Sequence, residues 1–217
     1  MLFNSKITPI WILAVPRSGS SFLVDFLNRT NLFNPKFREF NLDLEKKEQI
    51  LFNLPKYIKL QRIFFEFKGF CDYDDKNKIL KKYPNIKFII TQRKNIYEQT
   101  VSTYFAEYSK KWSINNKKEL EKYKKLVIPY NEKELIRLFK RNYDHINCWD
   151  NFVQNTNYIK VNYEEITNNY YVFFKKICNF IKLKIEINKN IDKISLIKLQ
   201  RKETKEYVEK LKKIIES

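Results

Sequence analysis

The sequence predicts a single α/β domain in which helices flank a central, largely parallel β-sheet. Short β-prone apolar runs alternate with stretches of helical apolar spacing along the chain, and this alternation is typical of parallel sheets. The 217 residues, 43% of them hydrophobic, suffice for one sizeable core, and no internal repeat or long linker divides them. We therefore predict one domain over residues 1–217.

The first predicted unit is a strand, a tight polar loop and a helix. Residues 10–15 form a β-prone apolar run that stops at Pro16. Apolar side chains then recur at helical spacing, and Ser20 or Ser21 supplies a helix N-cap. Because ligands of such folds bind outside the carboxyl ends of strands, this loop is a candidate binding site.

The later part of the chain repeats the same alternation. Strands are predicted over residues 62–68, 86–91 and 158–161, and helices over residues 74–82, 96–112, 132–154 and 166–180. Each predicted strand is thus separated from the next by at least one helix, which is the usual connection between parallel strands.

The composition limits the partners that we expect. A formal net charge of +18 attracts polyanions, but the lysines are spread through a background rich in Lys, Asn and Ile, so we expect no specific nucleic-acid partner. No apolar run is long enough for a signal peptide or a membrane span. Cys71, Cys148 and Cys178 are odd in number and widely spaced, which predicts neither a disulfide framework nor a zinc site and favours a cytoplasmic location.

The stretch VPRSGSSFL contains one of only two glycines in the chain. Gly19 therefore marks a position where a Cβ is not tolerated, because φ is positive or because a ligand approaches the backbone closely. A serine-rich turn before a helix offers N–H groups, hydroxyls and the positive end of a helix dipole to an anion, usually phosphate. The nucleotide-triphosphatase pattern G-x-x-x-x-G-K-[ST] is absent, since the basic residue here precedes the glycine.

The stretch PRSGSSFL resembles, residue for residue, the 5′-phosphosulfate loop of sulfotransferases. The resemblance implies a P-loop-like three-layer fold, 3′-phosphoadenosine 5′-phosphosulfate (PAPS) as donor without a metal, and sulfuryl transfer to a hydroxyl or amine of a carbohydrate or other small acceptor. It assigns the phosphosulfate to Arg17, Ser18, Gly19, Ser20, Ser21 and Phe22. The arginine among them would also neutralise charge that develops on the bridging oxygen.

Two further stretches resemble donor-binding elements of the same family. TQRKNIYEQTVSTYF is similar to the element that holds the donor 3′-phosphate: Ser102 matches its serine, and either Arg93 or Lys94 matches its basic residue. Two adjacent basic residues are usual here in the carbohydrate and trehalose-type sulfotransferases. KVNYEEITNN is similar to a segment of the family beside the adenine, which implies that position for Tyr163.

The resemblance also suggests a second phosphate contact and catalytic groups. LQRKETKEYVEKL is similar to a basic element that closes over the 3′-phosphate, with Arg201 and Lys202 at the matching positions. NPKFREFN resembles a segment of the trehalose-type group that carries a proposed catalytic carboxylate, so Glu39, in a predicted polar loop, is the first candidate base. Lys68, at the end of a predicted strand, is the reserve and could stabilise the sulfuryl oxygens. The single histidine, His145, is expected on a helix away from the strand ends.

Two other classes of function remain alternatives. The first is a small-molecule or nucleotide kinase with an atypical phosphate loop, which the missing glycine-lysine pair disfavours. The second is a protein without catalysis that binds a glycan or nucleic acid through its positive charge and aromatics, although no nucleic-acid-binding signature is present. The acceptor pocket is expected in loops over residues 33–60 and 113–131, which are rich in Lys and Tyr.

Overall fold

The computed structural model of the chain describes residues 10–29, 38–41, 60–64, 73–114, 116–182 and 201–217. Its centre is a five-stranded sheet in the order β2-β3-β1-β4-β5, in which every pair of neighbours is parallel. The strands are β1 (Ile10–Ala14), β2 (Arg38–Asn41), β3 (Leu60–Phe64), β4 (Lys87–Gln92) and β5 (Tyr158–Asn162). The predicted α/β fold with a parallel sheet is confirmed.

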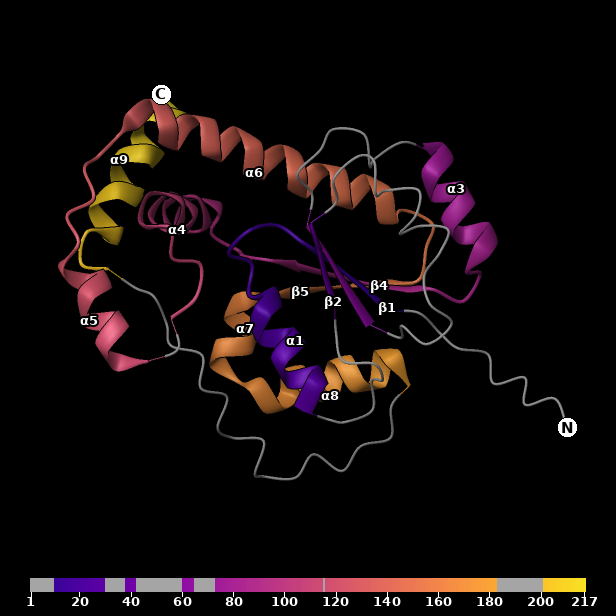
Figure 1. Ribbon diagram of the computed structural model, residues 1–217. Coiled ribbons are helices and arrows are strands. Elements are labelled where there is room, and N and C mark those ends of the chain that lie inside the picture. Colours follow the sequence, from indigo (N-terminus) through magenta and orange to yellow (C-terminus); the bar gives the residue numbers. More distant parts are fainter. Residues whose placement is uncertain (1–9, 30–37, 42–59, 65–72, 115, 183–200) are drawn as a thin grey trace, which may run out of the picture.

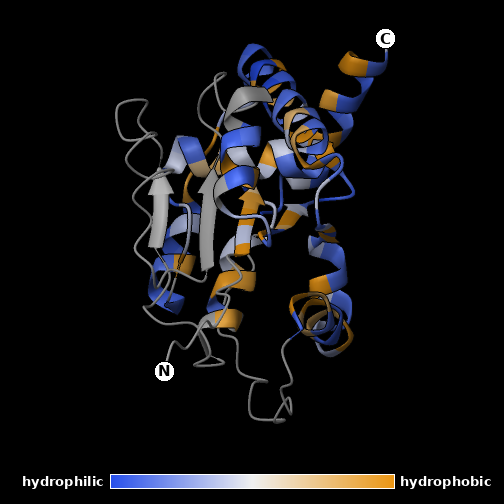
Figure 2. Ribbon diagram, turned by 90° about the vertical axis from the view of Figure 1, so that its right-hand side faces the viewer, coloured by the Kyte–Doolittle hydropathy of each residue, from blue (hydrophilic) through white to orange (hydrophobic). Residues whose placement is uncertain are grey.

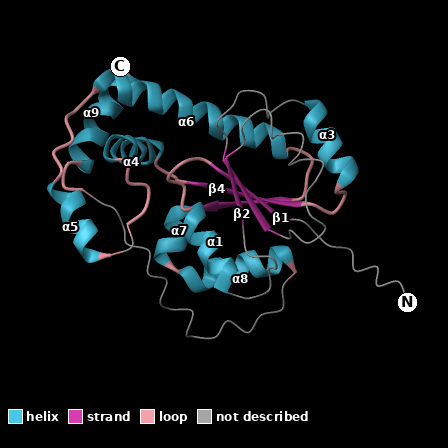
Figure 3. Ribbon diagram, viewed as in Figure 1, coloured by secondary structure: helices cyan, strands magenta, loops and turns pink. Residues whose placement is uncertain are grey.

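Helices cover both faces of this sheet (Figures 1 and 3). One face is covered by α1 (Ser20–Arg29), α7 (Tyr163–Asn168) and α8 (Tyr170–Ile181), and the other by α3 (Tyr73–Lys82) and α6 (Glu132–Val153). Next to α6 lie α4 (Ile96–Ser109) and α9 (Thr204–Glu216), while α5 (Lys117–Lys125) lies at the left edge of Figure 1. The helices carry both orange and blue segments in Figure 2, as expected of helices that bury one side.

The central strand β1 is buried on both faces because its side chains alternate between two cores. Ile12 packs in one cluster with Leu23 of α1, and Leu13 packs in the other with Trp149 of α6. The chain also changes direction here, since β3 is the neighbour of β1 on one side and β4 on the other. Parallel sheets bind ligands at the carboxyl ends of strands around such a switch point, so the fold itself singles out this edge.

Asparagine side chains cap the starts of four helices. The side-chain oxygen of each accepts a hydrogen bond from the backbone N–H three residues later, and the caps are Asn95, Asn116, Asn131 and Asn169. In the first three cases the N–H donor belongs to a glutamate, whose charge is also favourable at a helix N-terminus. An Asn-rich chain thus uses asparagine to fix the helix starts.

Several boundaries differ from the sequence prediction. Residues 38–41, expected in a loop, form the edge strand β2, in which Glu39 is in register with Arg62 of β3. The single helix expected over residues 166–180 is two helices, because Asn169 ends α7 and caps α8. The helices α5 and α9 were not predicted.

The cysteines do not follow the expectation from their spacing. Cys178 is a free, buried thiol, whereas Cys148 is disulfide-bonded, a bond that the spacing of the cysteines did not predict. The cytoplasmic location stays a prediction, and this disulfide counts against one of the reasons for it. Within the described parts of the chain, no helix has the length and apolar character that a membrane span requires.

Candidate functional site

Three segments meet at the carboxyl ends of β1, β4 and β5. The loop from Pro16 to Gly19 follows β1, Arg93 follows β4, and Tyr163 follows β5 as the first residue of α7. In Figure 1 the indigo loop that joins β1 to α1 lies between α4 and α7. Contacts from the loop to both helices confirm this placement, and they are described next.

Arg17 connects the loop to α4 and to the segment that follows α4. Its Nε donates a hydrogen bond to Ser102 Oγ at 2.9 Å, and one of its Nη groups donates to the carbonyl oxygen of Trp112 at 2.6 Å. Its backbone has a φ of +64°, which is uncommon for a residue with a side chain. A residue in such a conformation stores strain, which the surrounding contacts must offset.

Arg17 and Arg93 bring two positive charges together in a partly buried place. Burial lowers the pKa of Arg17, and the neighbouring Arg93 cation lowers this pKa further. Burial also lowers the pKa of Arg93, while Tyr163 and Glu164 act in the opposite direction. Within the described residues no carboxylate forms an ion pair with Arg17. Two partly desolvated cations without a carboxylate between them favour a bound anion.

Gly19 is required by the backbone and by its neighbour. Its φ is +88°, a region that residues with a Cβ rarely adopt. A Cβ at this position would lie 2.8 Å from Cδ2 of Tyr163 and 3.3 Å from Cδ1 of Ile166. Of the two reasons that the sequence offered for this glycine, the positive φ is therefore present, and a close tyrosine ring adds to it.

Arg93 and Tyr163 lie directly behind the loop. The Arg93 guanidinium carbon is 4.3 Å from the centre of the Tyr163 ring, so it covers one face of that ring. Arg93 Nε also donates a hydrogen bond to the backbone oxygen of Arg17 at 2.7 Å. The position of Tyr163 beside an adenine stays a prediction.

The serines and the phenylalanine of the loop have different surroundings. Ser18 is fully buried, and its Oγ is 2.7 Å from Thr91 Oγ1 at the end of β4, so this hydroxyl is already engaged. Ser20 is buried and Ser21 is exposed at the start of α1, where the positive end of the helix dipole lies. The helix begins at Ser20, so the expected serine cap lies inside the first turn. Phe22 stacks on Phe174 of α8 at 6.2 Å between ring centres.

Lys94 and Ser102 are both near this edge of the sheet. The backbone N–H of Lys94 donates to a carboxylate oxygen of Glu164 at 3.1 Å, and its side chain is exposed. Ser102 Oγ accepts the hydrogen bond from Arg17, which places it beside the phosphate loop. The structure thus brings Arg17, Gly19, Arg93, Lys94 and Ser102 into one region.

Arg201 has a different environment from the other predicted phosphate ligands. Its side chain is 1% exposed, and its Nη groups donate to the carbonyl oxygens of Tyr123 and Leu126 at the end of α5. Its guanidinium also lies 5.4 Å from the Phe105 ring centre, and its Nε is 3.3 Å from a carboxylate oxygen of Glu203. This arginine therefore ties the segment before α9 to α5, while its predicted partner in phosphate binding, Lys202, is exposed.

The candidate bases are not brought to the loop by any described contact. The structure describes the backbone of Glu39 in β2, two strands away from β1, and Lys68 lies outside the described residues. His145 lies on α6, as expected. The described part of the chain contains no group of three or more His, Cys, Asp or Glu side chains suited to a metal ion. The roles of Glu39 and Lys68 stay predictions.

His145 predicts a pH dependence of stability. Burial lowers the pKa of His145 to about 4, and Arg141 contributes in the same direction. The unfolded chain, with a pKa near 6.5, then binds a proton that the folded chain does not, so stability falls as the pH falls from about 6.5 to about 4. We expect a loss of about 1–2 kcal/mol between pH 6.5 and 5 in urea unfolding. In His145→Gln this part of the slope is absent; equal slopes in both proteins would contradict the assignment.

Two polar residues of the site were not singled out by the sequence. Gln99 is buried in α4, and its Nε2 donates to the carbonyl oxygen of Pro16 at 2.8 Å. Thr91, the partner of Ser18, is also fully buried. Helix and strand periodicity assign both positions to the core. A polar residue at a core position needs a hydrogen-bond partner, and this signal could have identified them.

Known proteins resemble this chain in sequence and in fold. Residues 71–213, more than half of the chain, match the family model described as Stf0 sulphotransferase. The mouse sulfotransferase SULT7A1 complexed with PAP is similar in structure, with a TM-score of 0.52 and 19% identity over 89% of this chain. A sulfotransferase from Alicyclobacillus acidocaldarius is 12% identical, with a TM-score of 0.46 over 96% of both chains.

The similarities differ in how much of each chain they cover and in sequence identity. No curated protein matches the chain. This chain spans 64% of the mouse protein, less than two thirds of its length, and at such low identity the likeness concerns the fold. The family match is more specific, because it includes the segments that carry Arg93, Ser102, Tyr163 and Arg201. The chain belongs to the Stf0 sulphotransferase family.

Proposed function

We propose that the chain is a sulfotransferase that transfers the sulfuryl group of PAPS to a hydroxyl or amine of a carbohydrate or other small acceptor. Membership of the Stf0 sulphotransferase family supports the reaction. The mouse sulfotransferase of similar fold is complexed with PAP, the desulfated donor adenosine 3′,5′-bisphosphate, and this supports the choice of donor.

The observation that carries the proposal is the pair of arginines at the phosphate loop. Arg93 Nε donates to the backbone oxygen of Arg17, and burial, followed by the Arg93 charge, lowers the pKa of Arg17. No described carboxylate forms an ion pair with Arg17. The loop also leads into the N-terminus of α1, whose dipole favours negative charge. A phosphosulfate placed here would supply the missing anion.

The proposed reaction needs a positive charge at the leaving oxygen and a base at the acceptor. The acceptor oxygen or nitrogen forms a bond to sulfur, the bond from sulfur to the bridging oxygen breaks, and that oxygen keeps the electron pair. The Arg17 guanidinium, held by Ser102 and Trp112, would lie against this oxygen and stabilise its growing charge. The acceptor proton leaves to a base, and Glu39 remains the predicted group, with Lys68 in reserve.

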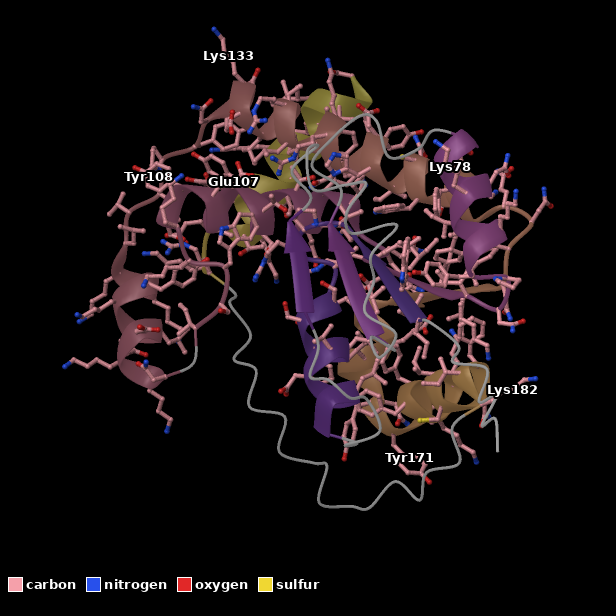
Figure 4. The ribbon with its side chains drawn as sticks, turned by 45° about the vertical axis from the view of Figure 1, so that its right-hand side comes forward. Lys78, Glu107, Tyr108, Lys133, Tyr171 and Lys182 are labelled. Carbon is pink, nitrogen blue, oxygen red and sulfur yellow. The ribbon has the colours of Figure 1, made fainter. Side chains whose placement is uncertain are left out.

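A carbohydrate acceptor is supported by the surface next to Arg17. Trp112, whose carbonyl oxygen accepts from Arg17, is 46% exposed. Tyr108, at the left in Figure 4, is 48% exposed and belongs to α4, the helix that also carries Ser102. Exposed aromatic rings offer flat faces on which sugar rings can stack. The following helix α5 has exposed Lys122, Lys124 and Lys125, which would attract an anionic sugar. Neutral and anionic oligosaccharides are therefore the first acceptors to screen.

The donor predicts a clear order of nucleotide affinities. PAP carries a 3′-phosphate that AMP lacks, and this phosphate would meet the basic and hydroxyl groups after β4. We expect PAP to bind at least tenfold more tightly than AMP in isothermal titration calorimetry, which corresponds to one or two charge-assisted hydrogen bonds. PAP is also expected to raise the melting temperature more than equal concentrations of ATP or an oligonucleotide.

The same titrations separate the alternatives. Tighter binding of ATP than of PAP would favour the atypical kinase. A melting temperature raised only by the oligonucleotide would favour a nucleic-acid-binding protein. Equal affinities for PAP and AMP would remove the 3′-phosphate site and overturn the proposed donor.

A further inference from the structure

We infer that Arg93 is a positioning residue, which holds the phosphate loop in shape together with Tyr163, and not a ligand of the donor 3′-phosphate. This inference rests on the proposed function, since it concerns which of two adjacent basic residues binds the donor. The sequence alone left open which of the two would touch the 3′-phosphate.

Arg93 contacts the loop twice, directly at Arg17 and through the Tyr163 ring at Gly19. Its Nε donates to the backbone oxygen of Arg17 at 2.7 Å, and its guanidinium covers the Tyr163 ring at 4.3 Å. The edge of that ring in turn lies against Gly19, where an added Cβ would be 2.8 Å from Cδ2. This chain of contacts therefore begins and ends at loop residues, Arg17 and Gly19.

These two loop residues also have positive φ angles. Arg17 has a φ of +64° and Gly19 a φ of +88°. A non-glycine residue in this region is strained, and it persists only where neighbouring contacts over-determine it. The hydrogen bond from Arg93 to Arg17 is one such contact. The conformation that presents the Arg17 side chain to Ser102 therefore depends on Arg93.

Arginine is suited to this role in a way that lysine is not. A guanidinium is planar, so it can stack on an aromatic ring while its Nε donates in the plane of the group. An ammonium would keep the charge but lose the stacked face and the directed Nε hydrogen bond. A residue that only neutralised a phosphate would tolerate the exchange far better.

Lys94 has the opposite character. Its side chain is exposed, and its backbone N–H is fixed by a carboxylate oxygen of Glu164 at 3.1 Å. It thus has a fixed starting point directly after β4, and its charge acts on the Glu165 carboxylate of α7. A flexible ammonium of this kind binds a phosphate as a point charge.

The test is the affinity ratio of PAP to AMP in four variants. Arg93→Ala and Arg93→Lys should each weaken PAP and AMP binding by the same factor, about tenfold, and leave the ratio within twofold of the parent. Lys94→Ala should lower PAP affinity more than AMP affinity, so that the ratio falls about tenfold. Tyr163→Leu, which removes the stacking partner, should behave like Arg93→Ala. These magnitudes are those of one lost hydrogen bond or ion contact.

Controls separate the inference from a fold defect and from failure of the proposed function. Melting temperatures show which variants are folded at the titration temperature, and Arg93→Lys is the milder substitute if Arg93→Ala unfolds. Tyr163→Phe keeps the ring and should bind both nucleotides more tightly than Tyr163→Leu does. A ratio that collapses in either Arg93 variant, or recovery of parent affinity in Arg93→Lys, would overturn the inference while leaving the donor assignment intact. A parent chain that binds PAP no better than AMP would instead overturn the proposed donor, and the inference with it.

Discussion

Arg17→Ala is expected to lower the rate of sulfuryl transfer by about a hundred- to a thousandfold while lowering PAP affinity only about tenfold. The value of a positive charge next to the bridging oxygen rises as that oxygen gains charge, so the transition state loses more than the bound ground state. The substitution leaves the backbone strain unchanged, since alanine also has a Cβ at a φ of +64°. Single-turnover transfer and PAP titration, compared in the same preparation, measure the two effects separately.

Arg17→Lys is the matched variant for this prediction. A lysine keeps the charge, but one ammonium cannot reproduce both the hydrogen bond to Ser102 and the one to the Trp112 carbonyl. We expect it to recover part of the rate. Equal losses of rate and of PAP affinity in Arg17→Ala would mean that the arginine only binds the donor, and a parent-like rate would remove it from the reaction.

Sequence predicted the parts of the fold in which burial leaves a strong pattern. β1 is a run of five buried residues, and α6 keeps apolar spacing over 22 residues, so the order of apolar residues along the chain predicted both. The strand-loop-helix unit around Gly19 was predicted because a rare glycine and clustered serines have a direct backbone meaning. The site's position then followed from the topology of parallel sheets.

The elements that the sequence did not predict have few buried apolar residues, or have basic residues that suggested phosphate binding instead of a helix. α5 has one buried residue, Tyr123, among nine, and β2 has only four residues at the sheet edge. α9 does bury Tyr207 and Leu211 at helical spacing, but the family resemblance draws attention to the basic residues of this segment as phosphate ligands. Where most residues of a helix are charged, its few apolar positions give only a weak helical pattern in the sequence.

Side-chain direction could not be predicted from a family resemblance. Resemblance placed Arg201 in a phosphate-binding element, yet its guanidinium is enclosed by two carbonyl oxygens and Glu203. Residue type and chain order do not say whether an arginine turns toward a ligand or toward the ends of a neighbouring helix. Gln99 shows the converse, because its contact with the Pro16 carbonyl depends on how closely α4 approaches the loop.

Gly19→Ala is expected to weaken PAP binding about a hundredfold and to lower the free energy of unfolding by about 1–3 kcal/mol. Positive φ alone costs a residue with a Cβ an amount of this order. The new Cβ would also lie 2.8 Å from Cδ2 of Tyr163, and that ring cannot move freely because the Arg93 guanidinium covers its face. Either the ring or the loop must shift, and both shifts disturb the place where the anion would bind. PAP titration and urea unfolding measure the two losses.

A double-mutant cycle separates the contribution of φ from that of the clash. Tyr163→Ala removes the ring atom at 2.8 Å but leaves the φ of +88° unchanged. If the clash dominates, Gly19→Ala costs much less affinity in the Tyr163→Ala background than in the parent, because the new methyl group then has room. If backbone strain dominates, the two losses add. Parent-like PAP affinity and stability in Gly19→Ala would contradict both, since the loop would then tolerate a side chain at the one position where its geometry excludes it.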